Sequence, residues 1–334
     1  MHEKPNGKIL FTGGAGYIGS HVVRCFIEKG IKPEGIIVVD DLSSGRKDLI
    51  PQGCQFYEID VTDEPALRRV FREHEIDAIF HFAGLIQVEE SMRKPFEYFK
   101  VNVFGGLNVL NLMKEYKVNK IIFSSTAGVY GVPDYLPIDE NHPCRPVNVY
   151  AEGKLMFEKT LEWFDRLFGV KYVALRYFNA CGIRDGLGDY HRPYTHLIPK
   201  LALNLLGVES PFRLFGDDYL TPDGTCVRDF IDVRDLAEAH HLAYEYLKKF
   251  NQSNVFNLGS GKGHSVKEII RLMEELSGQK VNFVVEKKRS GDPPQLVCSN
   301  KKAERLLAWL PKTGIKESIL SHWLWFKENR AVWG

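Results

Sequence analysis

The sequence predicts a doubly wound α/β fold, a parallel sheet covered by helices on both faces, together with a smaller C-terminal α/β lobe. Short apolar segments typical of buried parallel strands alternate with segments of helical periodicity through the first half of the chain. The first of these strands runs into a glycine-rich turn that opens a helix. Because each parallel crossover needs an element long enough to return the chain, this alternation favours a Rossmann-type sheet.

The first lobe can be predicted element by element. Residues 8–12 form an apolar run that enters the glycines, and residues 17–29 have helical periodicity up to Gly30. Further strands are expected at residues 36–40, 55–60, 77–82, 120–125 and 170–176. A helix is expected at residues 95–116. Its apolar stripe, more typical of core packing than of a dimer interface, consists of Phe99, Val103, Leu107 and Leu110.

The second lobe is expected where this pattern loosens. Residues 181–196 form a loop rich in Gly, His and Tyr, so we place the domain boundary between residues 1–180 and 181–334. The helices expected in the second domain cover residues 233–249, 266–276 and 318–329, and its short strands lie near Phe212, Val255 and Val281.

The composition argues against several classes of protein. The chain has 44 Lys and Arg against 43 Asp and Glu, and 44% hydrophobic residues, which favours neither disorder nor a nucleic-acid partner. No stretch approaches the ~18 apolar residues of a membrane span, and the first ten residues lack the apolar core of a signal peptide. The six cysteines are far apart, without a C-x-x-C pair or zinc-finger spacing, so we expect reduced thiols, no metal and a cytoplasmic protein.

A glycine-rich motif follows the first predicted strand. Residues 13–19 read GGAGYIG, which matches G-x-G-x-x-G from Gly14 and the variant G-x-x-G-x-x-G from Gly13. Backbone N–H groups at the start of the following helix can receive a pyrophosphate, and the absent side chains permit its close approach. The motif therefore predicts a dinucleotide site. The alternative is a tight strand-to-helix turn without a ligand.

The end of the second predicted strand indicates which dinucleotide binds. Asp40 lies near the ~20-residue distance at which an acid meets the adenosine ribose. A carboxylate there repels a 2′-phosphate, and Asp41 beside it adds to that repulsion, so NAD is favoured over NADP. Arg46 is the one nearby residue that argues for NADP, and a solvated strand-end carboxylate is the alternative for Asp40.

Tyr150 and Lys154 form the candidate catalytic pair. Free tyrosine has a pKa of ~10, so only about one molecule in a thousand is phenolate at neutral pH. Lys154, four residues on and on the same helix face, would favour the phenolate together with an oxidised nicotinamide. The spacing alone is also typical of a structural pair. The hydroxyl run from Ser124 to Thr126, at a predicted strand end where such sheets bind ligands, favours catalysis, although these residues also serve as caps.

With these residues, the chain resembles the extended short-chain dehydrogenase/reductase family and, within it, the 4-epimerases of UDP-hexoses. The resemblance runs nearly end to end. The segments that carry it are GGAGYIGSH, DLSSG, HFAGL, FSSTAGVYG, YAEGK, RYFNACG, HLIP, FGDDYLTPDGTCVRDFIDVRDLAEAH, NLGSGKGHSV and RSGD. The first and fifth are widespread among relatives, whereas DGTCVRDFI with the run before it is much more specific to the epimerases.

The resemblance implies a role for each candidate residue. Tyr150 would be the base, Lys154 its activator and a ligand of the nicotinamide ribose, and Thr126 the hydroxyl partner of the sugar oxygen. The implied NAD contacts are Gly13, Gly14, Gly16, Tyr17, Ile18, Gly19, Asp40, Asp41, Leu42, Ser43, Ser44, Gly45, Asp60, Val61, Phe82, Ala83, Gly84, Ser124, Tyr150, Lys154, Tyr177 and Phe178. The implied UDP-sugar contacts are Thr126, Tyr150, Asn179, His196, Leu197, Arg213, Leu214, Phe215, Arg228, Arg289, Asp292 and Leu296.

The activity implied by the resemblance is NAD-dependent inversion at carbon four of UDP-glucose or UDP-galactose through a 4-keto intermediate. The keto sugar, attached mainly through UDP, would turn its other face to the nicotinamide before reduction. Residues 1–180 would bind NAD, residues 181–334 would bind the nucleotide-sugar, and a homodimer is implied by resemblance alone. The alternatives are a 4-epimerase of UDP-N-acetylglucosamine or of a UDP-pentose, and an NAD-binding sensor without turnover. A dehydratase is disfavoured because Ala127 and Gly128 stand where it needs an acid–base pair.

Some positions depart from the family pattern. Ile86 stands where relatives commonly have a lysine, and Val101 precedes Asn102 where they often have two asparagines. His196 stands where an asparagine commonly meets the substrate. Leu296 occupies a gate position at which a bulky aromatic residue restricts the pocket to plain hexoses and a small residue admits N-acetylhexosamines. Leucine is intermediate in size and leaves the choice of sugar open.

Overall fold

The computed structural model describes residues 7–184, 186–289 and 292–330, and it confirms the predicted doubly wound fold. A seven-stranded parallel sheet has the order β10-β6-β5-β4-β1-β2-β3. Its strands are β1 (Lys8–Thr12), β2 (Ile36–Asp40), β3 (Gln55–Glu58), β4 (Ile76–His81), β5 (Lys120–Thr126), β6 (Lys171–Tyr177) and β10 (Asn254–Leu258). Among the described residues, no helix combines the length and apolarity needed to cross a membrane.

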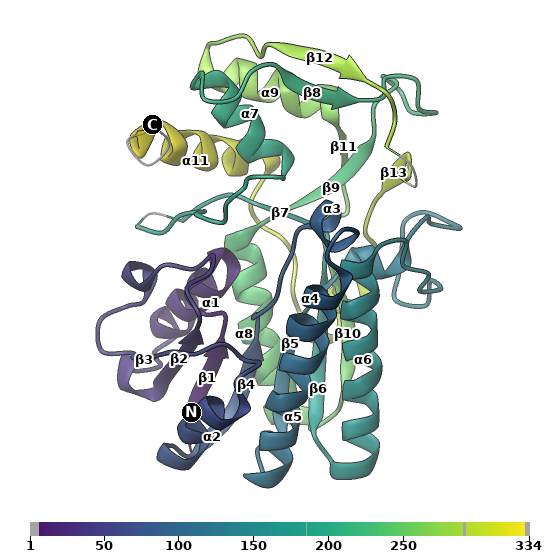
Figure 1. The fold of residues 1–334 in the computed structure, drawn as a ribbon. Coiled ribbons are helices and arrows are strands. Elements are labelled where there is room, and N and C mark those ends of the chain that lie inside the picture. The colour runs from purple at the N-terminus through teal and green to yellow at the C-terminus, as the bar shows by residue number, and fades with distance from the viewer. Residues whose placement is uncertain (1–6, 185, 290–291, 331–334) are drawn as a thin grey trace.

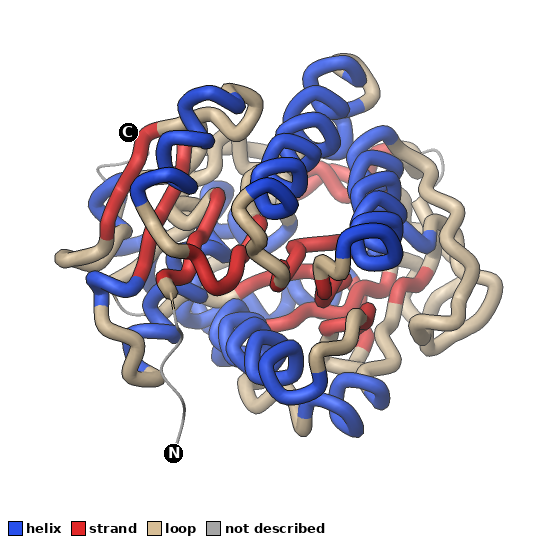
Figure 2. The backbone as a smooth tube through the Cα atoms, turned by 90° about the horizontal axis from the view of Figure 1, so that it is seen from below, coloured by secondary structure: helices blue, strands red, loops and turns tan. Residues whose placement is uncertain are grey.

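Helices cover both faces of this sheet, as Figure 2 shows along the strands. The two faces follow from the period of two in a strand, since Ile9 and Phe11 of β1 enter one apolar core and Leu10 enters the other. The helices on the first face are α1 (Tyr17–Glu28), α8 (Val233–Phe250) and α10 (Lys301–Leu307). Those on the second are α2 (Glu64–Glu73), α5 (Gly106–Glu115) and α6 (Val149–Phe168).

Our placement of residues 233–249 and of the strand near Val255 in the second lobe is wrong. The chain returns to the first body after residue 232: α8 packs against α1, and β10 pairs with β6 as the edge strand of the large sheet. Periodicity correctly identifies a helix and a strand. It does not show which sheet edge is free to pair with the strand, or which surface the helix covers. The first body is therefore assembled from three separate stretches of the chain, since α10 also packs in its core.

The second body lies over the carboxyl ends of the large sheet (Figure 1). Its core joins α7, α9 and α11 through residues such as Leu201, Ile269 and Trp323. Its helices are α7 (Leu197–Leu205), α9 (Val266–Ser277) and α11 (Ile315–Glu328). Its strands are β7 (Asn179–Cys181), β8 (Phe212–Phe215), β9 (Val227–Asp232), β11 (Gly263–Ser265), β12 (Phe283–Glu286) and β13 (Gln295–Leu296). β9 is central, with β11, β13 and β7 paired to it, while β12 pairs with β8.

The helix expected at residues 95–116 is interrupted. It consists of α4 (Pro95–Phe99), a π-helical segment (Lys100–Gly105) and α5. Of its predicted apolar stripe, Leu110 is fully buried, whereas Phe99, Val103 and Leu107 are only half-buried. Short helical turns complete the fold: α3 (Val88–Ser91), η1 (Pro33–Gly35), η2 (Lys47–Leu49) and η4 (Ala127–Tyr130).

Candidate active site

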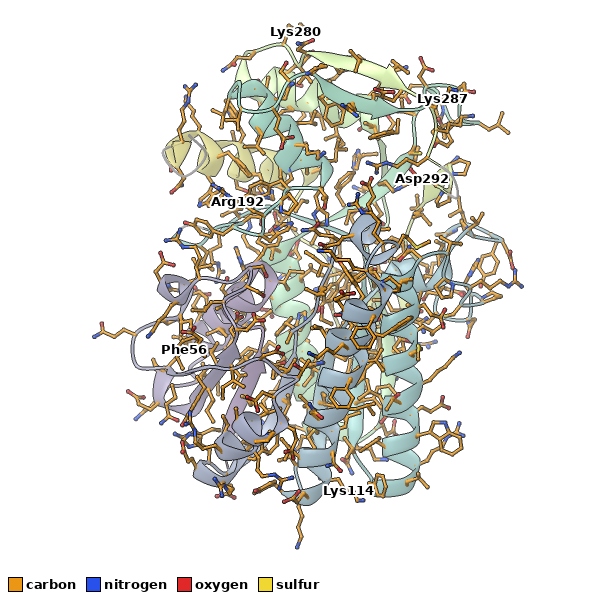
Figure 3. The ribbon with its side chains drawn as sticks, in the orientation of Figure 1. Phe56, Lys114, Arg192, Lys280, Lys287 and Asp292 are labelled. Atoms are coloured by element: carbon orange, nitrogen blue, oxygen red, sulfur yellow. The ribbon has the colours of Figure 1, made fainter. Side chains whose placement is uncertain are left out.

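A cleft of about 1240 Å³ lies between the two bodies, at the carboxyl ends of β1, β2, β4 and β5. It runs from the glycine loop past Tyr150 to the loop around Asp292. Figure 3 labels Asp292 at the boundary between the two bodies. Almost every residue predicted to bind NAD or the UDP-sugar lines it. The predicted contacts that do not are Gly14, Leu42 and Gly45. Of the RSGD motif, Ser290 and Gly291 fall outside the described residues.

The glycine loop is shaped by contacts that exclude side chains. Gly13 has φ +71°, and a Cβ there would come within 2.5 Å of the backbone nitrogen of Ala83. A Cβ on Gly19 would lie 2.2 Å from the carbonyl oxygen of Gly13. The loop thus packs directly on the chain after β4. Because Gly16 caps α1 without a side-chain hydrogen bond, the first N–H groups of the helix remain available for an anion.

Asp40 organises the loop that follows β2. One of its carboxylate oxygens accepts from the backbone nitrogen of Ala15 and the other from that of Leu42, both at 2.9 Å. Burial raises the pKa of Asp40, and the two hydrogen bonds oppose that rise. Arg46 forms an ion pair with Asp48 at 2.6 Å and lies over the Tyr190 ring, so its charge is already satisfied. The structure therefore weakens the argument for NADP.

Tyr150 and Lys154 lie in the first turns of α6, which begins after Asn148 caps the backbone nitrogen of Ala151. Lys154 is buried, and its Nζ donates to the carbonyl oxygen of Ser124 at 2.9 Å and lies 5.9 Å from the centroid of the Tyr150 ring. Tyr150 is half-buried in the cleft wall, and its side chain is hydrogen-bonded to that of Thr126. The structure thus brings the predicted base, cation and hydroxyl together.

The protein's own groups do not ionise this phenol. Desolvation raises the pKa of Tyr150 to about 12, against the smaller opposing effect of the hydrogen bond with Thr126. Desolvation also lowers the pKa of Lys154 to about 8, while Glu158 one turn further along raises it. Our expectation that Lys154 and an oxidised nicotinamide together favour the phenolate therefore depends on the charge of the nicotinamide, because burial outweighs the effect of the nearby residues alone.

The opposite wall of the cleft carries the predicted UDP-sugar contacts. Arg228 is ion-paired with Asp292, and the side chain of Asn179 donates to the carbonyl oxygen of Asp229 at 2.9 Å. Arg289 stacks 4.0 Å from the centroid of the Phe215 ring. It also reaches Glu89 of α3 across the cleft at 3.1 Å. The stacking holds the Arg289 guanidinium beside the segment predicted to contact the uracil, and a planar guanidinium can bind phosphate oxygens.

Comparisons with known proteins agree with this geometry. Residues 9–259 match the model of the NAD dependent epimerase/dehydratase family. A UDP-glucose 4-epimerase of Streptococcus mutans is 46% identical over 321 residues, which cover 95% of this chain and 96% of that protein.

The chain belongs to the NAD dependent epimerase/dehydratase family.

Solved structures of this family superpose closely on the chain. That of a UDP-glucose 4-epimerase from Brucella ovis in complex with NAD has a TM-score of 0.92 at 37% identity, covering 96% of this chain and 98% of that one. That of the UDP-Glc/GlcNAc 4-epimerase from Campylobacter jejuni has a TM-score of 0.85 at 39% identity, covering 97% of this chain and all of that one (100%).

The first body fits the NAD of this family. The space that a Cβ on Gly13 or Gly19 would fill leaves the backbone of the loop open to a pyrophosphate. Asp40, with its two backbone donors in place, keeps further lone pairs for ribose hydroxyls. Lys154, which lines the same cleft, would hold the nicotinamide ribose.

Sequence reasoning assigned no role to some residues of the site. Asn102 lies in the π-helical segment, accepts from the backbone nitrogen of Leu85 at 2.7 Å and donates to its carbonyl oxygen at 2.9 Å. It thereby clamps the chain after β4 beside Gly84. An amide between the apolar residues Val101 and Val103 was the available signal. Asp189, His191 and His322 also line the cleft, and no motif spacing pointed to them.

The departures from the family pattern all lie in the cleft wall. Ile86 is 38% exposed there, and Val101 is half-buried beside it. Leu296 on β13 packs against the cluster of Phe178 and Ala127 and also lines the cleft. Its side chain therefore forms part of the cleft wall.

Proposed function

We propose that this protein is an NAD-dependent 4-epimerase that interconverts UDP-glucose and UDP-galactose. The observation that carries the proposal is the meeting of Tyr150, Thr126 and Lys154 in the middle of one cleft, between a dinucleotide loop and two arginines. NAD, when bound, supplies the reversible oxidant for carbon four.

The residues of the first body handle the proton. Tyr150 takes the proton of the sugar 4-hydroxyl on its phenol oxygen and returns it when the ketone is reduced. Thr126, already hydrogen-bonded to Tyr150, shares that oxygen and orients it toward the sugar. The ammonium of Lys154, fixed by the carbonyl of Ser124, stabilises the phenolate once the site is filled. The sugar thus loses and regains one proton at one side chain.

The residues of the second body hold the nucleotide while the sugar turns. Arg228 and Arg289 would contact the diphosphate, residues 213–215 the uracil, and Asp292 the uridine ribose. Two guanidinium groups can bind the two phosphates and leave the hexose free to rotate. The 4-keto sugar then rotates about its link to UDP and presents its other face, which inverts carbon four. We accordingly assign NAD binding to the first body and nucleotide-sugar binding to the second.

A 4-epimerase that also accepts UDP-N-acetylglucosamine is the second candidate. The leucine at position 296 favours it, because this side chain leaves more of the cleft open than an aromatic residue would. UDP-pentoses fit the same space. Comparing the turnover of each UDP-sugar in a separate incubation shows which substrate the enzyme prefers.

The protein would act as a homodimer. Apolar side chains protrude from neighbouring helices, with Phe96 of α4 74% exposed, Trp163 of α6 58% exposed and Leu167 64% exposed. Phe104 of the π-helical segment is also exposed, and α4 and α6 pack side by side (Figure 1). An apolar face of this kind is typical of an isologous interface. Trp163→Glu should convert the dimer to monomer in sedimentation velocity, and an unchanged sedimentation coefficient would contradict this surface.

The protein would work in a reducing compartment such as the cytoplasm. All six cysteines lie among the described residues and are free thiols. Free, buried thiols of this kind are usual where disulfides do not persist.

Incubation with UDP-galactose, followed by separation of the products, tests the activity. UDP-glucose should form without added NAD, because the cofactor is regenerated in each cycle and stays bound. A protein that carries NAD yet leaves UDP-galactose, UDP-N-acetylglucosamine and UDP-xylose unchanged would be a binding protein and not an epimerase.

A further inference from the structure

A line of polar side chains leads from the interior of the second body to the cleft. The buried carboxylate of Asp189 is paired with Nδ1 of His191. Nε2 of His191 lies 3.1 Å from Nδ1 of His196, whose ring lines the cleft. The other carboxylate oxygen of Asp189 lies 3.5 Å from Nε2 of His322 on α11. The proposed mechanism uses neither Asp189 nor His191.

The contacts fix where the ring protons can lie. Since Asp189 accepts, Nδ1 of His191 carries a proton in either charge state. If His191 is an imidazolium, its Nε2 donates to Nδ1 of His196, and the single proton of a neutral His196 must lie on Nε2. If His191 is neutral, its Nε2 accepts from Nδ1 of His196, and Nε2 of His196 becomes an acceptor. The charge of His191 therefore decides whether His196 offers the cleft a donor or an acceptor.

The surroundings favour the donor. Burial lowers the pKa of His191, but the ion pair with Asp189 outweighs burial and holds it above its ordinary value. Desolvation in the deep cleft, and secondly His191, lower the pKa of His196 to about 4, an effect weakened by the exposure of its ring to the cleft. Within the part of the chain that the structure describes, the other titratable groups against this line are Tyr17 of α1, Tyr194 of the same loop and His322 of α11.

The position of His196 indicates what it would contact. It is the N-cap residue of α7, a helix whose N-terminus favours anions, and its side chain makes no capping hydrogen bond. Arg228 and Arg289 line the same cleft. An N–H donor at this point would form a stronger hydrogen bond with a diphosphate oxygen than with a neutral sugar hydroxyl.

We propose that Asp189 and His191 are positioning residues that keep the proton of His196 on Nε2, so that His196 donates a hydrogen bond to a diphosphate oxygen of the UDP-sugar. This rests on the proposed function. UDP-sugar affinity then falls as pH rises and His191 loses its charge, because Nε2 of His196 turns from a donor into an acceptor facing an anion.

Titration calorimetry of the NAD-loaded enzyme with UDP-glucose tests this from mildly acidic to mildly alkaline pH. The diphosphate of UDP-glucose is esterified at both ends and does not titrate in this range. Affinity should fall roughly tenfold, the usual scale for a hydrogen bond to a charged group. Uridine, which has no phosphate, should show no such fall. A pH-independent affinity for UDP-glucose, or an equal fall for uridine, would overturn the proposal.

Two variants distinguish a role in positioning the proton of His196 from a purely structural role in the loop. Asp189→Asn removes the charge that favours the imidazolium of His191, so the midpoint of the fall should move to lower pH. In His196→Asn, an amide can donate whatever the state of His191, so the midpoint should disappear. An Asp189→Asn enzyme that melts like the unmodified protein and keeps its midpoint contradicts the inference.

Nitrogen-15 NMR of histidine-labelled, unmodified enzyme gives a readout that needs neither a variant nor turnover. At mildly acidic pH the proton of His196 should be on Nε2, and it should move to Nδ1 as His191 loses its charge. A proton on Nδ1 at acidic pH would refute the inference. Failure of UDP-glucose to bind at any pH would instead refute the proposed function, so the two failures are distinguishable.

Discussion

Nζ of Lys154 donates to the backbone carbonyl oxygen of Ser124 at 2.9 Å, so the end of β5 fixes the ammonium next to the Tyr150 ring. Its position also brings it 4.9 Å from the centroid of the Phe123 ring. The cation is therefore held by the sheet before any ligand arrives. Little reorganisation is needed when charge develops on the phenol.

Lys154→Met should lower kcat by roughly 100-fold or more, the scale expected when acid–base catalysis fails. The substitution removes the charge and keeps the length of the side chain. Lys159→Met is the matched control, since Lys159 lies on the same helix but is exposed. Steady-state kinetics with UDP-galactose measure both. Equal activity of the two variants would show that the ammonium is not needed.

The pKa of Tyr150 should depend on the cofactor. Without NAD, burial holds it at about 12, so the phenol stays protonated at every physiological pH. The positive charge of oxidised nicotinamide stabilises the phenolate, so loading with NAD should lower this pKa. Ultraviolet titration of the unmodified protein against Tyr150→Phe isolates the signal of this one phenol. An identical titration with and without NAD would contradict the assigned base.

Gly13→Ala should abolish NAD retention. The new Cβ would meet the backbone nitrogen of Ala83 at 2.5 Å, so the loop has to move away from β4. Gly169 is a matched control, because it has the same φ of +71° and a Cβ added to it would meet nothing within 4 Å. Gly169→Ala should cost about 1–2 kcal/mol of stability through its backbone alone and keep NAD. Bound NAD after gel filtration distinguishes the two effects.

The buried ion pair between α6 and β6 should be important for stability. Glu158 accepts from Nε of Arg176 at 3.0 Å and from Nη2 at 2.6 Å, and Arg176 also donates to the hydroxyl of Tyr130 at 2.8 Å. Glu158→Gln leaves a buried guanidinium without its counter-charge, which should cost roughly 3–5 kcal/mol. Chemical denaturation measures the change. A loss below about 1 kcal/mol would show that water or another group already solvates Arg176.

Leu296→Tyr should narrow the cleft at the sugar. Turnover of UDP-N-acetylglucosamine should be lost, because the larger sugar would clash with the tyrosine ring. Turnover of UDP-galactose, a smaller sugar, should fall by less than about tenfold. Leu296→Met, of similar volume, is the control. Parallel assays with the two substrates provide the measurement. An equal loss for both sugars would place Leu296 outside the sugar pocket.

The sequence predicts those parts of the protein that depend on local signals. β1 and β2 match their predicted bounds, because a strand buried on both faces is continuously apolar. Gly13 and Asp40 are identifiable because the turn and the strand end need those residue types. Lys154 and Tyr150 become candidates through their spacing on one helix together with the hydroxyl run from Ser124 to Thr126.

The remaining features depend on contacts between distant segments. The return of β10 to β6 is set by a free sheet edge and has no local signal. The clamp of Asn102 on Leu85 and the line from Asp189 to His196 depend on where loops meet in space. The high pKa of Tyr150 follows from desolvation, and the extent of desolvation cannot be predicted from the spacing of residues along a helix.

The most direct test of the central claim is the fate of deuterium placed on carbon four of UDP-glucose. Incubation with purified enzyme, without added NAD, should give UDP-galactose that keeps the deuterium on carbon four, because the hydrogen leaves and returns within one closed site. Mass spectrometry and proton NMR of the product report it. Loss of the label to solvent, or the absence of UDP-galactose, would contradict the proposed chemistry.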